Sequence, residues 1–354
     1  MNKPRIHIYQ PVDDTGESYR RMRERGLDVI APVENYLDAA NRRDHVEVMF
    51  DKETVAAAGV ANRTKSVTRK SLESAPDLRL IAKYTVGFDN VDVDAATELG
   101  VLVVHSPTET NWGGVAEGTV ANILAVLKKV RERDRHVKNG GWRDMSLQGI
   151  YLGPRQIDNY PGITLGIIGL GRIGSRVADL FAPWRFRIIA CDPYVDESKF
   201  VLHNASPVDL DTVLKTSDVV TIHCNLTKET RNLIGVRELA LMKSTAVLVN
   251  AARGPIVDID ALFDALDRKQ IASAALDVLP DEPPDPQTPI LGLDDRVMLS
   301  PHMISNNVGS GLKASVPWVE QAIYDAANGE APRHIVNPEA LPRWRERFGG
   351  KKLI

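Results

Sequence analysis

Residues 163–174 read ITLGIIGLGRIG, a run of mostly apolar residues that passes directly into the spacing Gly-x-Gly-x-x-Gly at Gly169, Gly171 and Gly174. The run predicts a buried strand, and the glycines predict a tight turn into a helix. In such a turn, backbone amides and the positive end of the helix dipole can lie against a pyrophosphate, and side chains at the glycine positions would block that approach. The spacing alone is weak evidence, because with 25 glycines in 354 residues it arises by chance in roughly one such chain in eight.

The residues after the glycine spacing strengthen its interpretation. Asp192 ends the next apolar run, 18 positions after Gly174, where a carboxylate can accept hydrogen bonds from the adenosine ribose of a dinucleotide. The same carboxylate would repel a 2′-phosphate, and Pro193 and Tyr194 follow it instead of Arg or Lys. We therefore expect NAD rather than NADP as the coenzyme. The competing interpretation is a glycine turn in a domain that binds no nucleotide.

The composition predicts a globular protein without a nucleic-acid or membrane partner. Hydrophobic residues make up 43% and charged residues 26% of the chain, and the net charge of −3 offers no excess of Lys and Arg for phosphate binding. The first residues hold too short an apolar run for a secretory signal, and no stretch approaches the ~18 apolar residues of a membrane span, so we expect a cytoplasmic protein. Cys191 and Cys224 stand at the edges of apolar runs outside any CxxC pair, so we expect core-edge thiols and no metal site.

Two series of alternating strands and helices predict two α/β domains with parallel sheets, and the length of the chain also favours two domains. The expected strands of the first series are 5–9, 46–50, 78–84 and 101–105. Those of the second series are 163–168, 186–190, 219–223, 246–249, 274–276 and 297–299. Helical periodicity runs over 115–130 and 314–328, and the stretch 140–162, rich in Gly, Pro and Asn, predicts a connecting loop.

Three polar residues follow strands of the second series: Arg253 in Asn-Ala-Ala-Arg-Gly, Glu282 in Asp-Val-Leu-Pro-Asp-Glu-Pro, and His302 in Ser-Pro-His. Reduction of a 2-oxo acid requires a cation for the carboxylate, polarisation of the carbonyl and a proton for its oxygen. The planar guanidinium of Arg253 suits the first two tasks, and the imidazole of His302 suits the third. Glu282 would bond the other ring nitrogen and stabilise the imidazolium. Alone, Arg253 could be a solvated cap, Glu282 a surface residue and His302 the end of a strand. Ligands of open α/β sheets bind at the carboxyl ends of the strands, however, so we expect one catalytic site.

Ordered motifs along nearly the whole chain resemble those of the D-isomer-specific 2-hydroxyacid dehydrogenases, the family of D-3-phosphoglycerate, D-lactate, glycerate and hydroxypyruvate enzymes. The similarity covers the segments of the three polar residues, the glycine loop and the stretches 86–92, 115–117 and 226–230. The match is specific for the family and unspecific for the substrate. It implies reversible hydride transfer between NAD(H) and a 2-hydroxy or 2-oxo acid, with Arg253, Glu282 and His302 as catalytic residues.

The resemblance also implies binding roles. The backbone amides near Val86 and Gly87 match a second anchor for the substrate carboxylate, beside Arg253. The matching cofactor-binding positions are Gly169, Gly171, Arg172, Ile173, Gly174, Asp192, Thr230, Ala251, Ala252, Arg253 and Asp277. His223 ends a predicted strand of the nucleotide series and is expected to border the cofactor.

The fold of the family is interrupted, and this sets the expected domain boundaries. A flavodoxin-like substrate domain comprises residues 1–111 and 304–354, and a Rossmann NAD-binding domain, 112–303, is inserted into it. The resemblance further implies catalysis in a cleft between the domains and a homodimer that pairs through the NAD-binding domains. The connector 141–162 is longer than the usual link, and our hypothesis is that it lines or covers an active-site mouth, its own or that of a partner subunit.

Other functions share parts of this pattern. Formate-type dehydrogenases carry a glutamine where Glu282 stands, and phosphite-type enzymes place a lysine directly before the Gly-Phe-Asp-Asn stretch, where this chain has Val86. A non-catalytic NAD-sensing protein, like the corepressors that resemble these dehydrogenases, would need a peptide-binding groove. Lys83 could suit a phosphate or second carboxylate of the substrate, although a lysine near a loop is usually solvated. The substrate and the physiological direction therefore stay open.

Overall fold

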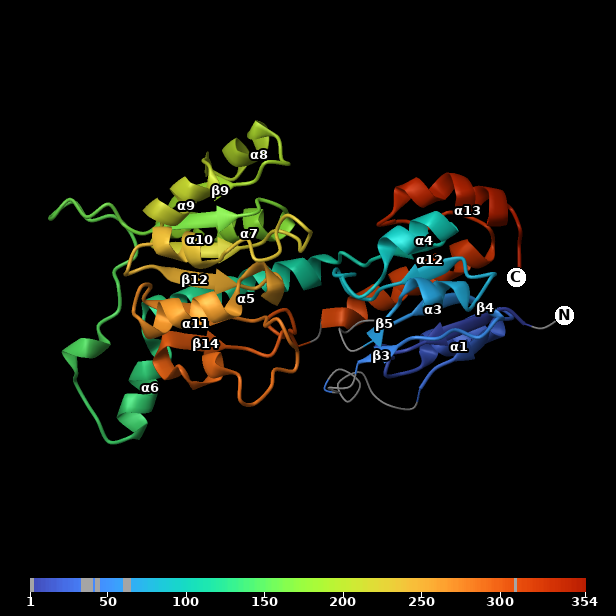
Figure 1. The fold of residues 1–354 in the computed structure, drawn as a ribbon, viewed down its shortest axis with the longest axis horizontal. Coiled ribbons are helices and arrows are strands. Elements are labelled where there is room, and N and C mark those ends of the chain that lie inside the picture. The colour runs from blue at the N-terminus through green and yellow to red at the C-terminus, as the bar shows by residue number, and fades with distance from the viewer. Residues whose placement is uncertain (1–2, 33–40, 42–44, 60–64, 309–310) are drawn as a thin grey trace. The chain divides into compact units, whose positions relative to one another are not determined.

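A computed structural model describes residues 3–32, 41, 45–59, 65–308 and 311–354. The chain divides into two compact units: unit 1 comprises Met1–Asn111 and Asn306–Ile354, and unit 2 comprises Trp112–Ser305. Each unit is built around its own parallel sheet (Figure 1). None of the described helices combines the length and the apolar character that crossing a bilayer requires.

Unit 2 contains a seven-stranded parallel sheet in the order β10-β9-β8-β11-β12-β13-β14. Its strands are β8 (Thr164–Ile168), β9 (Arg187–Cys191), β10 (Ser206–Pro207), β11 (Val219–Ile222), β12 (Val247–Asn250), β13 (Ser273–Leu276) and β14 (Val297–Leu299). The chain starts at β8, adds strands on one side and then returns to add strands on the other, which is the doubly wound arrangement of Rossmann domains. The direction switches between β8 and β11, beside the glycine loop, and such switch points are where open α/β sheets bind ligands.

Helices cover both faces of this sheet and enclose two hydrophobic cores. One face carries α5 (Glu109–Leu127), α7 (Arg172–Phe181) and α8 (Glu197–Leu202). The other carries α9 (Leu210–Thr216), α10 (Val236–Leu241) and α11 (Ile259–Asp267). Along β12, Val247 and Val249 belong to the first core and Leu248 to the second, following the two-residue period of a strand. Because both faces are buried, the strands have continuous apolar sequences.

The segment between α5 and β8 forms an arm with little regular structure. It holds α6 (Val130–Lys138), a short 3-10 turn and an isolated bridge between Arg155 and Tyr160. In Figure 1 the arm is the green segment that runs along the outside of unit 2 and projects from it. The predicted connecting loop 140–162 lies in this arm.

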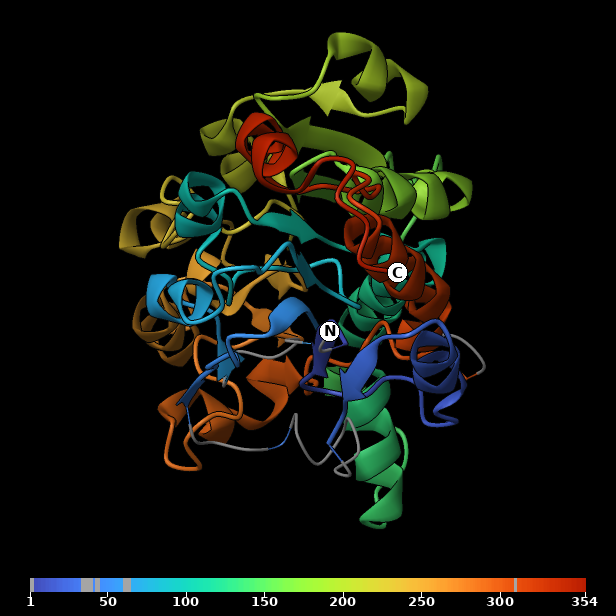
Figure 2. The ribbon, with the colours of Figure 1, turned by 90° about the vertical axis from the view of Figure 1, so that its right-hand side faces the viewer.

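Unit 1 contains a five-stranded parallel sheet in the order β2-β1-β4-β6-β7, the order of flavodoxin-like domains. Its strands are β1 (Arg5–Ile8), β2 (Asp28–Ile30), β4 (Thr54–Ala58), β6 (Leu80–Ala82) and β7 (Leu102–Val104). One face carries α1 (Glu17–Glu24), α12 (Val316–Ala327) and α13 (Leu341–Phe348), and the other carries α3 (Arg69–Glu73) and α4 (Val93–Leu99). Both ends of the chain belong to this unit (Figure 2).

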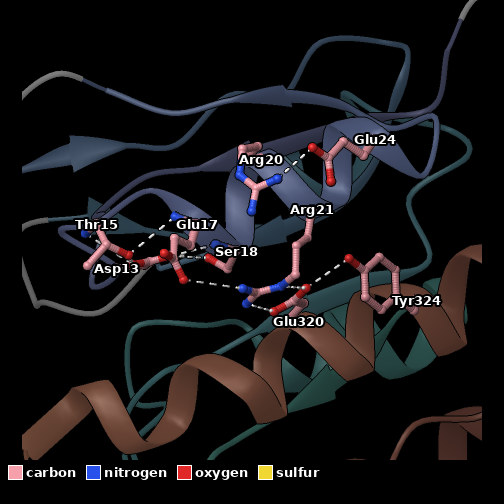
Figure 3. A network of polar contacts seen from close by, with 9 residues as sticks. All are labelled: Asp13, Thr15, Glu17, Ser18, Arg20, Arg21, Glu24, Glu320 and Tyr324. Atoms are coloured by element: carbon pink, nitrogen blue, oxygen red, sulfur yellow. Dashed lines mark hydrogen bonds and ion pairs between the residues drawn. The ribbon is translucent and has the colours of Figure 1, made fainter.

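Contacts between distant parts of the sequence hold the two stretches of unit 1 together. Arg21 of α1 donates two hydrogen bonds to Glu320 of α12, from Nε to Oε1 at 2.9 Å and from Nη2 to Oε2 at 2.6 Å (Figure 3). Tyr324 donates a third hydrogen bond to the same carboxylate at 2.8 Å. The buried Arg79, just before β6, donates to the carbonyl oxygen of Ala326 at the end of α12 at 2.9 Å. Because α12 follows unit 2 in sequence, these contacts join the two stretches of chain that form unit 1.

Most expected strands agree with the observed ones to within two residues at each end. The expectation of a buried strand at 46–50 is wrong, because only β3 (Val46–Glu47) is extended there; it is exposed and pairs with β5 (Lys65–Ser66) outside the main sheet. The main sheet instead contains β4, whose sequence TVAAA is rich in alanine, a residue depleted in strands. Short 3-10 turns lie at Met145–Leu147, Ala182–Trp184, Gly254–Ile256, Pro289–Gly292, Asp294–Arg296, Gly311–Ser315 and Pro338–Ala340.

Candidate active site

The three residues predicted to react follow three adjacent strands of unit 2. Arg253 lies after β12, Glu282 after β13 and His302 after β14. Because these strands are neighbours in a parallel sheet, their carboxyl ends lie at one edge. The glycine loop follows β8 at the same edge, with β11 between β8 and β12. The fold therefore gathers the segments of the three predicted residues and the glycine loop on one side of the sheet.

The turn that carries Arg253 is fixed by the buried side chain of Asn250. The Oδ1 atom of Asn250 accepts the amide of Ala252 at 3.0 Å, and its Nδ2 donates to the carbonyl of Arg253 at 2.9 Å. Gly254 packs so tightly that a Cβ atom there would lie 2.0 Å from the carbonyl carbon of Leu279. The Arg253 turn thus packs directly against the loop that leads to the predicted glutamate.

Glu282 and His302 form a hydrogen-bonded pair. The Oε2 atom of Glu282 lies 2.8 Å from Nδ1 of His302, while its Oε1 accepts the backbone amide of Leu279 at 3.0 Å. The histidine side chain is 45% exposed and the glutamate 20%, so the pair lies at the surface of unit 2 with the carboxylate on the inner side. Since Nδ1 faces the carboxylate, Nε2 is the ring nitrogen that can exchange a proton with a ligand.

Asp277, predicted to contact the cofactor, also holds the segment that carries His302. Its carbonyl accepts the amide of His302 at 2.8 Å, and its Oδ1 accepts the Ser300 hydroxyl at 2.6 Å and the Met303 amide at 3.1 Å. His302 has a φ of 55°, a left-handed conformation that is uncommon outside glycine and requires such support. Burial raises the pKa of Asp277, and the hydrogen bond from Ser300 acts in the opposite direction.

The three glycines of the loop differ in whether the fold itself requires glycine at their positions. Gly169 has a φ of 93°, and a Cβ there would lie 2.6 Å from the amide nitrogen of Cys224. A Cβ on Gly174 would lie 2.1 Å from the carbonyl oxygen of Gly169. Gly171, at the N-cap of α7, has an ordinary φ of −73°, and a Cβ there would meet nothing within 4 Å. The fold itself does not require glycine at this position, so the open space in front of it fits the approach of a ligand such as a pyrophosphate.

Asp192 lies beside this loop at the end of β9. Its Oδ2 accepts the amide of Leu170 at 2.8 Å and its Oδ1 accepts the amide of Tyr194 at 3.0 Å. Each carboxylate oxygen can accept a second hydrogen bond, so Asp192 can bind ribose hydroxyls as well. Arg172 and Ile173 begin α7; the first is exposed and the second packs partly against the core. This placement fits the predicted dinucleotide.

The structure gives two of the predicted cofactor residues other contacts. The Nε2 atom of His223 lies 2.9 Å from the Thr221 hydroxyl, and burial lowers the pKa of His223 to about 3, so this histidine is neutral. No described residue bonds its buried Nδ1 atom. The Thr230 hydroxyl donates to the carbonyl of Asn225 at 2.6 Å and accepts the amide of Thr227 at 2.8 Å. Thr230 therefore shapes a turn, and a direct contact with the cofactor stays a prediction.

Val86 and Gly87, the predicted carboxylate anchor, belong to unit 1 and follow β6. The carbonyl of Val86 lies 2.9 Å from Nδ1 of His105, and the carbonyl of Gly87 accepts the Thr85 hydroxyl at 2.8 Å. Within the part of the chain that the structure describes, neither amide donates a hydrogen bond. The loop therefore offers two backbone donors, as binding of an anion requires.

The sequence reasoning missed Asn250 and Ser300, which position the predicted residues without reacting. Both are polar residues at the ends of apolar strands, and that position was the available signal. Ala251 and Ala252 are buried in the turn between Asn250 and Arg253. Elsewhere, Cys191 and Cys224 are free, partly buried thiols, as expected. Among the described residues, no group of three or more His, Cys, Asp or Glu side chains could hold a metal ion.

Comparison with known proteins places this geometry in context. The family "D-isomer specific 2-hydroxyacid dehydrogenase, NAD binding domain" matches residues 120–303 of this chain. The glyoxylate reductase of Thermofilum pendens is 34% identical over 347 residues, which cover 96% of each chain. The D-3-phosphoglycerate dehydrogenase of Archaeoglobus fulgidus is 34% identical over 333 residues, 94% of this chain. The chain spans 59% of the length of this second relative.

A solved structure shows the same architecture. The D-lactate dehydrogenase of Aquifex aeolicus, determined with NAD and lactic acid, superimposes with a TM-score of 0.74 and 26% sequence identity, and the match covers 94% of this chain and 99% of that one.

Proposed function

The chain belongs to the D-isomer-specific 2-hydroxyacid dehydrogenase family, and we propose that it interconverts a 2-hydroxy acid and a 2-oxo acid with NAD as coenzyme, using Arg253, Glu282 and His302. The observation that carries this proposal is the 2.8 Å pair of Glu282 and His302 at the same sheet edge as the Arg253 turn and the glycine loop. The pair supplies a proton donor, and Arg253 supplies a fork of donors for a carboxylate and a carbonyl oxygen.

Each residue has a defined task in reduction. Arg253 binds the carboxylate of the 2-oxo acid and polarises its carbonyl, while the amides of Val86 and Gly87 bind the carboxylate a second time. His302 donates the proton from Nε2 to the carbonyl oxygen, and in oxidation it accepts that proton. Glu282 stabilises the imidazolium and fixes the ring orientation through Nδ1. The reduced nicotinamide, when bound, supplies the hydride.

The coenzyme is NAD rather than NADP in this proposal. The support is Asp192, whose carboxylate is held at the glycine loop by two backbone amides and would repel a 2′-phosphate. The open face of Gly171 supports pyrophosphate binding at the start of α7. We expect at least a tenfold preference for NADH over NADPH, about 1.4 kcal/mol.

The deciding experiment measures oxidation of NADH and NADPH with a panel of 2-oxo acids, including glyoxylate, pyruvate, hydroxypyruvate and its 3-phosphate. Turnover of any member that is lost in His302→Ala supports the dehydrogenase. If NADH binds but no 2-oxo acid, formate or phosphite reacts, the protein is an NAD-sensing binding protein instead. Turnover of formate or phosphite alone would assign the reaction to those rival donors.

We also propose that the protein is cytoplasmic, as the pattern of apolar residues in the sequence predicts, and that it forms a homodimer, as the resemblance predicts. The support for pairing is the arm of unit 2, whose large apolar side chains are exposed: Trp142, Met145, Ile150, Tyr151 and Ile157. Ile157 is 95% exposed, next to a turn in which the Arg155 guanidinium lies 4.7 Å from the centre of the Tyr160 ring. Light scattering should give twice the 39.0 kDa chain mass, and Trp142→Ser with Ile157→Asp should weaken the dimer. That the arm covers an active-site mouth stays a hypothesis.

A further inference from the structure

Lys83, at the end of β6 in unit 1, is fully buried. The expectation that it would be solvated is therefore wrong. A lysine is almost never fully buried unless its ammonium group is bonded, because removing that charge from water is unfavourable. Since none of its surface is exposed and its Nζ atom bonds to Asn90, Lys83 is placed to act through the protein groups that it contacts.

The ammonium group of Lys83 bonds to Asn90, three residues after the predicted carboxylate anchor at Val86 and Gly87. Nζ donates to Oδ1 of Asn90 at 2.5 Å, and Nδ2 of Asn90 donates to the carbonyl of Lys65 at 2.6 Å. The backbone of Lys83 is fixed as well, because its carbonyl accepts the Ser106 hydroxyl at 2.8 Å and its amide donates to the carbonyl of Val104 at 2.9 Å. Lys83 thus connects the rigid end of the sheet to Asn90.

The anchor loop, residues 84–90, follows Lys83 and ends at Asn90, and three of its carbonyl oxygens have hydrogen-bond partners within unit 1. The carbonyl of Val86 faces His105, that of Gly87 accepts the Thr85 hydroxyl, and that of Phe88 accepts the amide of Val91 at 3.0 Å. With the carbonyls engaged in this way, the amides of Val86 and Gly87 have no acceptor among the described residues. An anion that accepts from both amides needs this orientation to be preserved.

We propose that Lys83 is a positioning residue for the substrate: its buried ammonium group, bonded to Asn90, holds the anchor loop with the Val86 and Gly87 amides directed at the carboxylate of the 2-oxo acid. This inference rests on the proposed function. Lys83 acts through the loop and as a nearby positive charge, and it does not touch the reacting atoms. It therefore affects binding of the oxo acid more than the hydride step or binding of the coenzyme.

The test compares Lys83→Met, which removes the ammonium group at similar length, with the wild-type enzyme. We expect the KM for the best 2-oxo acid to rise at least about tenfold, the effect of losing one charged hydrogen bond. The kcat at saturating oxo acid and the KM for NADH should change by less than about threefold. Lys83→Gln, which keeps a donor for Asn90, should recover part of the loss. Lys70→Met is the matched control, because Lys70 is exposed and pairs with Glu47 in the same unit.

A second pair of variants covers the case in which Lys83→Met does not fold. Asn90→Ala removes the acceptor and should raise the same KM. A double variant that folds should raise the KM by less than the sum of the two single effects, because both single changes break the hydrogen bond between Lys83 and Asn90. An unchanged KM in a folded Lys83→Met or Asn90→Ala protein overturns the inference. An equal loss of kcat and of NADH affinity also overturns it, because it would indicate general damage.

Amide hydrogen exchange separates this inference from the proposed function. Peptides that cover residues 84–90 should exchange faster in Lys83→Met than in wild type, while peptides from unit 2 should not change. This result does not depend on turnover. If the wild type reduces no oxo acid, the proposed function fails, whereas unchanged exchange at the loop refutes the role of Lys83 directly.

Discussion

His302 and Glu282 lie 2.8 Å apart, but neighbouring residues set that distance. Asp277 holds His302 in its left-handed conformation, and the amide of Leu279 holds the second oxygen of Glu282. The two residues proposed to react are thus partly exposed, and one that orients them, Asp277, is buried. Such contacts keep a reacting group in one geometry. If the residues that support it could move, the reacting group would move with them.

At this scale, His302→Ala tests the acid-base assignment. Loss of a positioned proton donor should lower kcat for oxo-acid reduction by about 10²–10⁴-fold, while the affinity for NADH, measured by fluorescence titration, should stay within about threefold. His203→Ala is the control, because His203 also bonds a carboxylate, that of Asp179, and lies in the same unit away from the reactive segments. Wild-type turnover in His302→Ala would show that this histidine is not the acid-base residue.

Glu282→Gln tests the second member of the pair. Glutamine can keep a hydrogen bond to Nδ1 but removes the negative charge that stabilises the imidazolium, so kcat should fall about 10–100-fold with the KM for the oxo acid nearly unchanged. Asp281→Asn, the neighbouring carboxylate, is the control. Steady-state kinetics that show no difference between the two variants would contradict the assigned role.

The glycine loop shows how one element combines structural and ligand requirements. Gly169 and Gly174 are fixed by close backbone contacts within unit 2, whereas Gly171 has an ordinary backbone conformation and free space in front of it. The spacing in the sequence does not distinguish these cases. The structure does, because it shows what a side chain at each position would meet.

Two alanine substitutions in this element should therefore behave differently. Gly171→Ala should change the free energy of unfolding by less than about 0.5 kcal/mol but raise the Kd for NADH at least about tenfold, since the methyl group occupies the space for the pyrophosphate. Gly174→Ala places Cβ 2.1 Å from the carbonyl oxygen of Gly169 and should destabilise the fold by about 1–3 kcal/mol. Thermal unfolding and NADH titration of both variants check this. Unchanged NADH binding in Gly171→Ala would refute the pyrophosphate site.

At the scale of the whole molecule, unit 1 depends on contacts between residues about 300 positions apart. Arg21 and Glu320 join α1 to α12 across the whole length of unit 2 in the sequence. Burial opposes ionisation of Glu320, but the hydrogen bonds from Arg21 and Tyr324 outweigh it and lower the pKa of this carboxyl below its ordinary value. The ionised form is therefore the one that the folded unit stabilises.

Glu320→Gln should lower the free energy of unfolding of unit 1 by about 1–2 kcal/mol at pH 7, allowing for the solvent around Arg21. Because the folded pKa is lowered, the contribution of Glu320 is complete above the ordinary carboxyl pKa and is lost as the pH falls through the lowered value. The difference between variant and wild type should thus disappear in acid. Glu24→Gln, which breaks the exposed pair with Arg20, should cost less than about 0.5 kcal/mol at any pH (Figure 3). Equal effects of the two substitutions in denaturant unfolding would contradict the role of Glu320 in joining α12 to α1.

The sequence determined the parallel α/β class, most strands of unit 2 and the glycine loop, and it singled out Arg253, Glu282 and His302 as the residues for which we propose catalytic roles. These features depend on local patterns: strands buried on both faces give continuous apolar runs, and turns that approach a ligand need glycine. The sequence did not predict β4, because an alanine-rich strand is buried by its neighbours in the sheet and has little strand propensity of its own. Lys83 was misjudged because local sequence does not show how deep a side chain lies.

Only the tertiary structure decided which side chains meet. The hydrogen bonds from Ser300 and Met303 to Asp277, from Lys83 to Asn90 and from Arg21 to Glu320 all depend on the order of strands and helices in space. Distances between residues far apart in the sequence follow from packing of the whole sheet, so no local pattern contains them. Residue types and strand ends could therefore predict which side chains would gather at one side of the sheet, whereas the contacts that hold them in place could not be predicted.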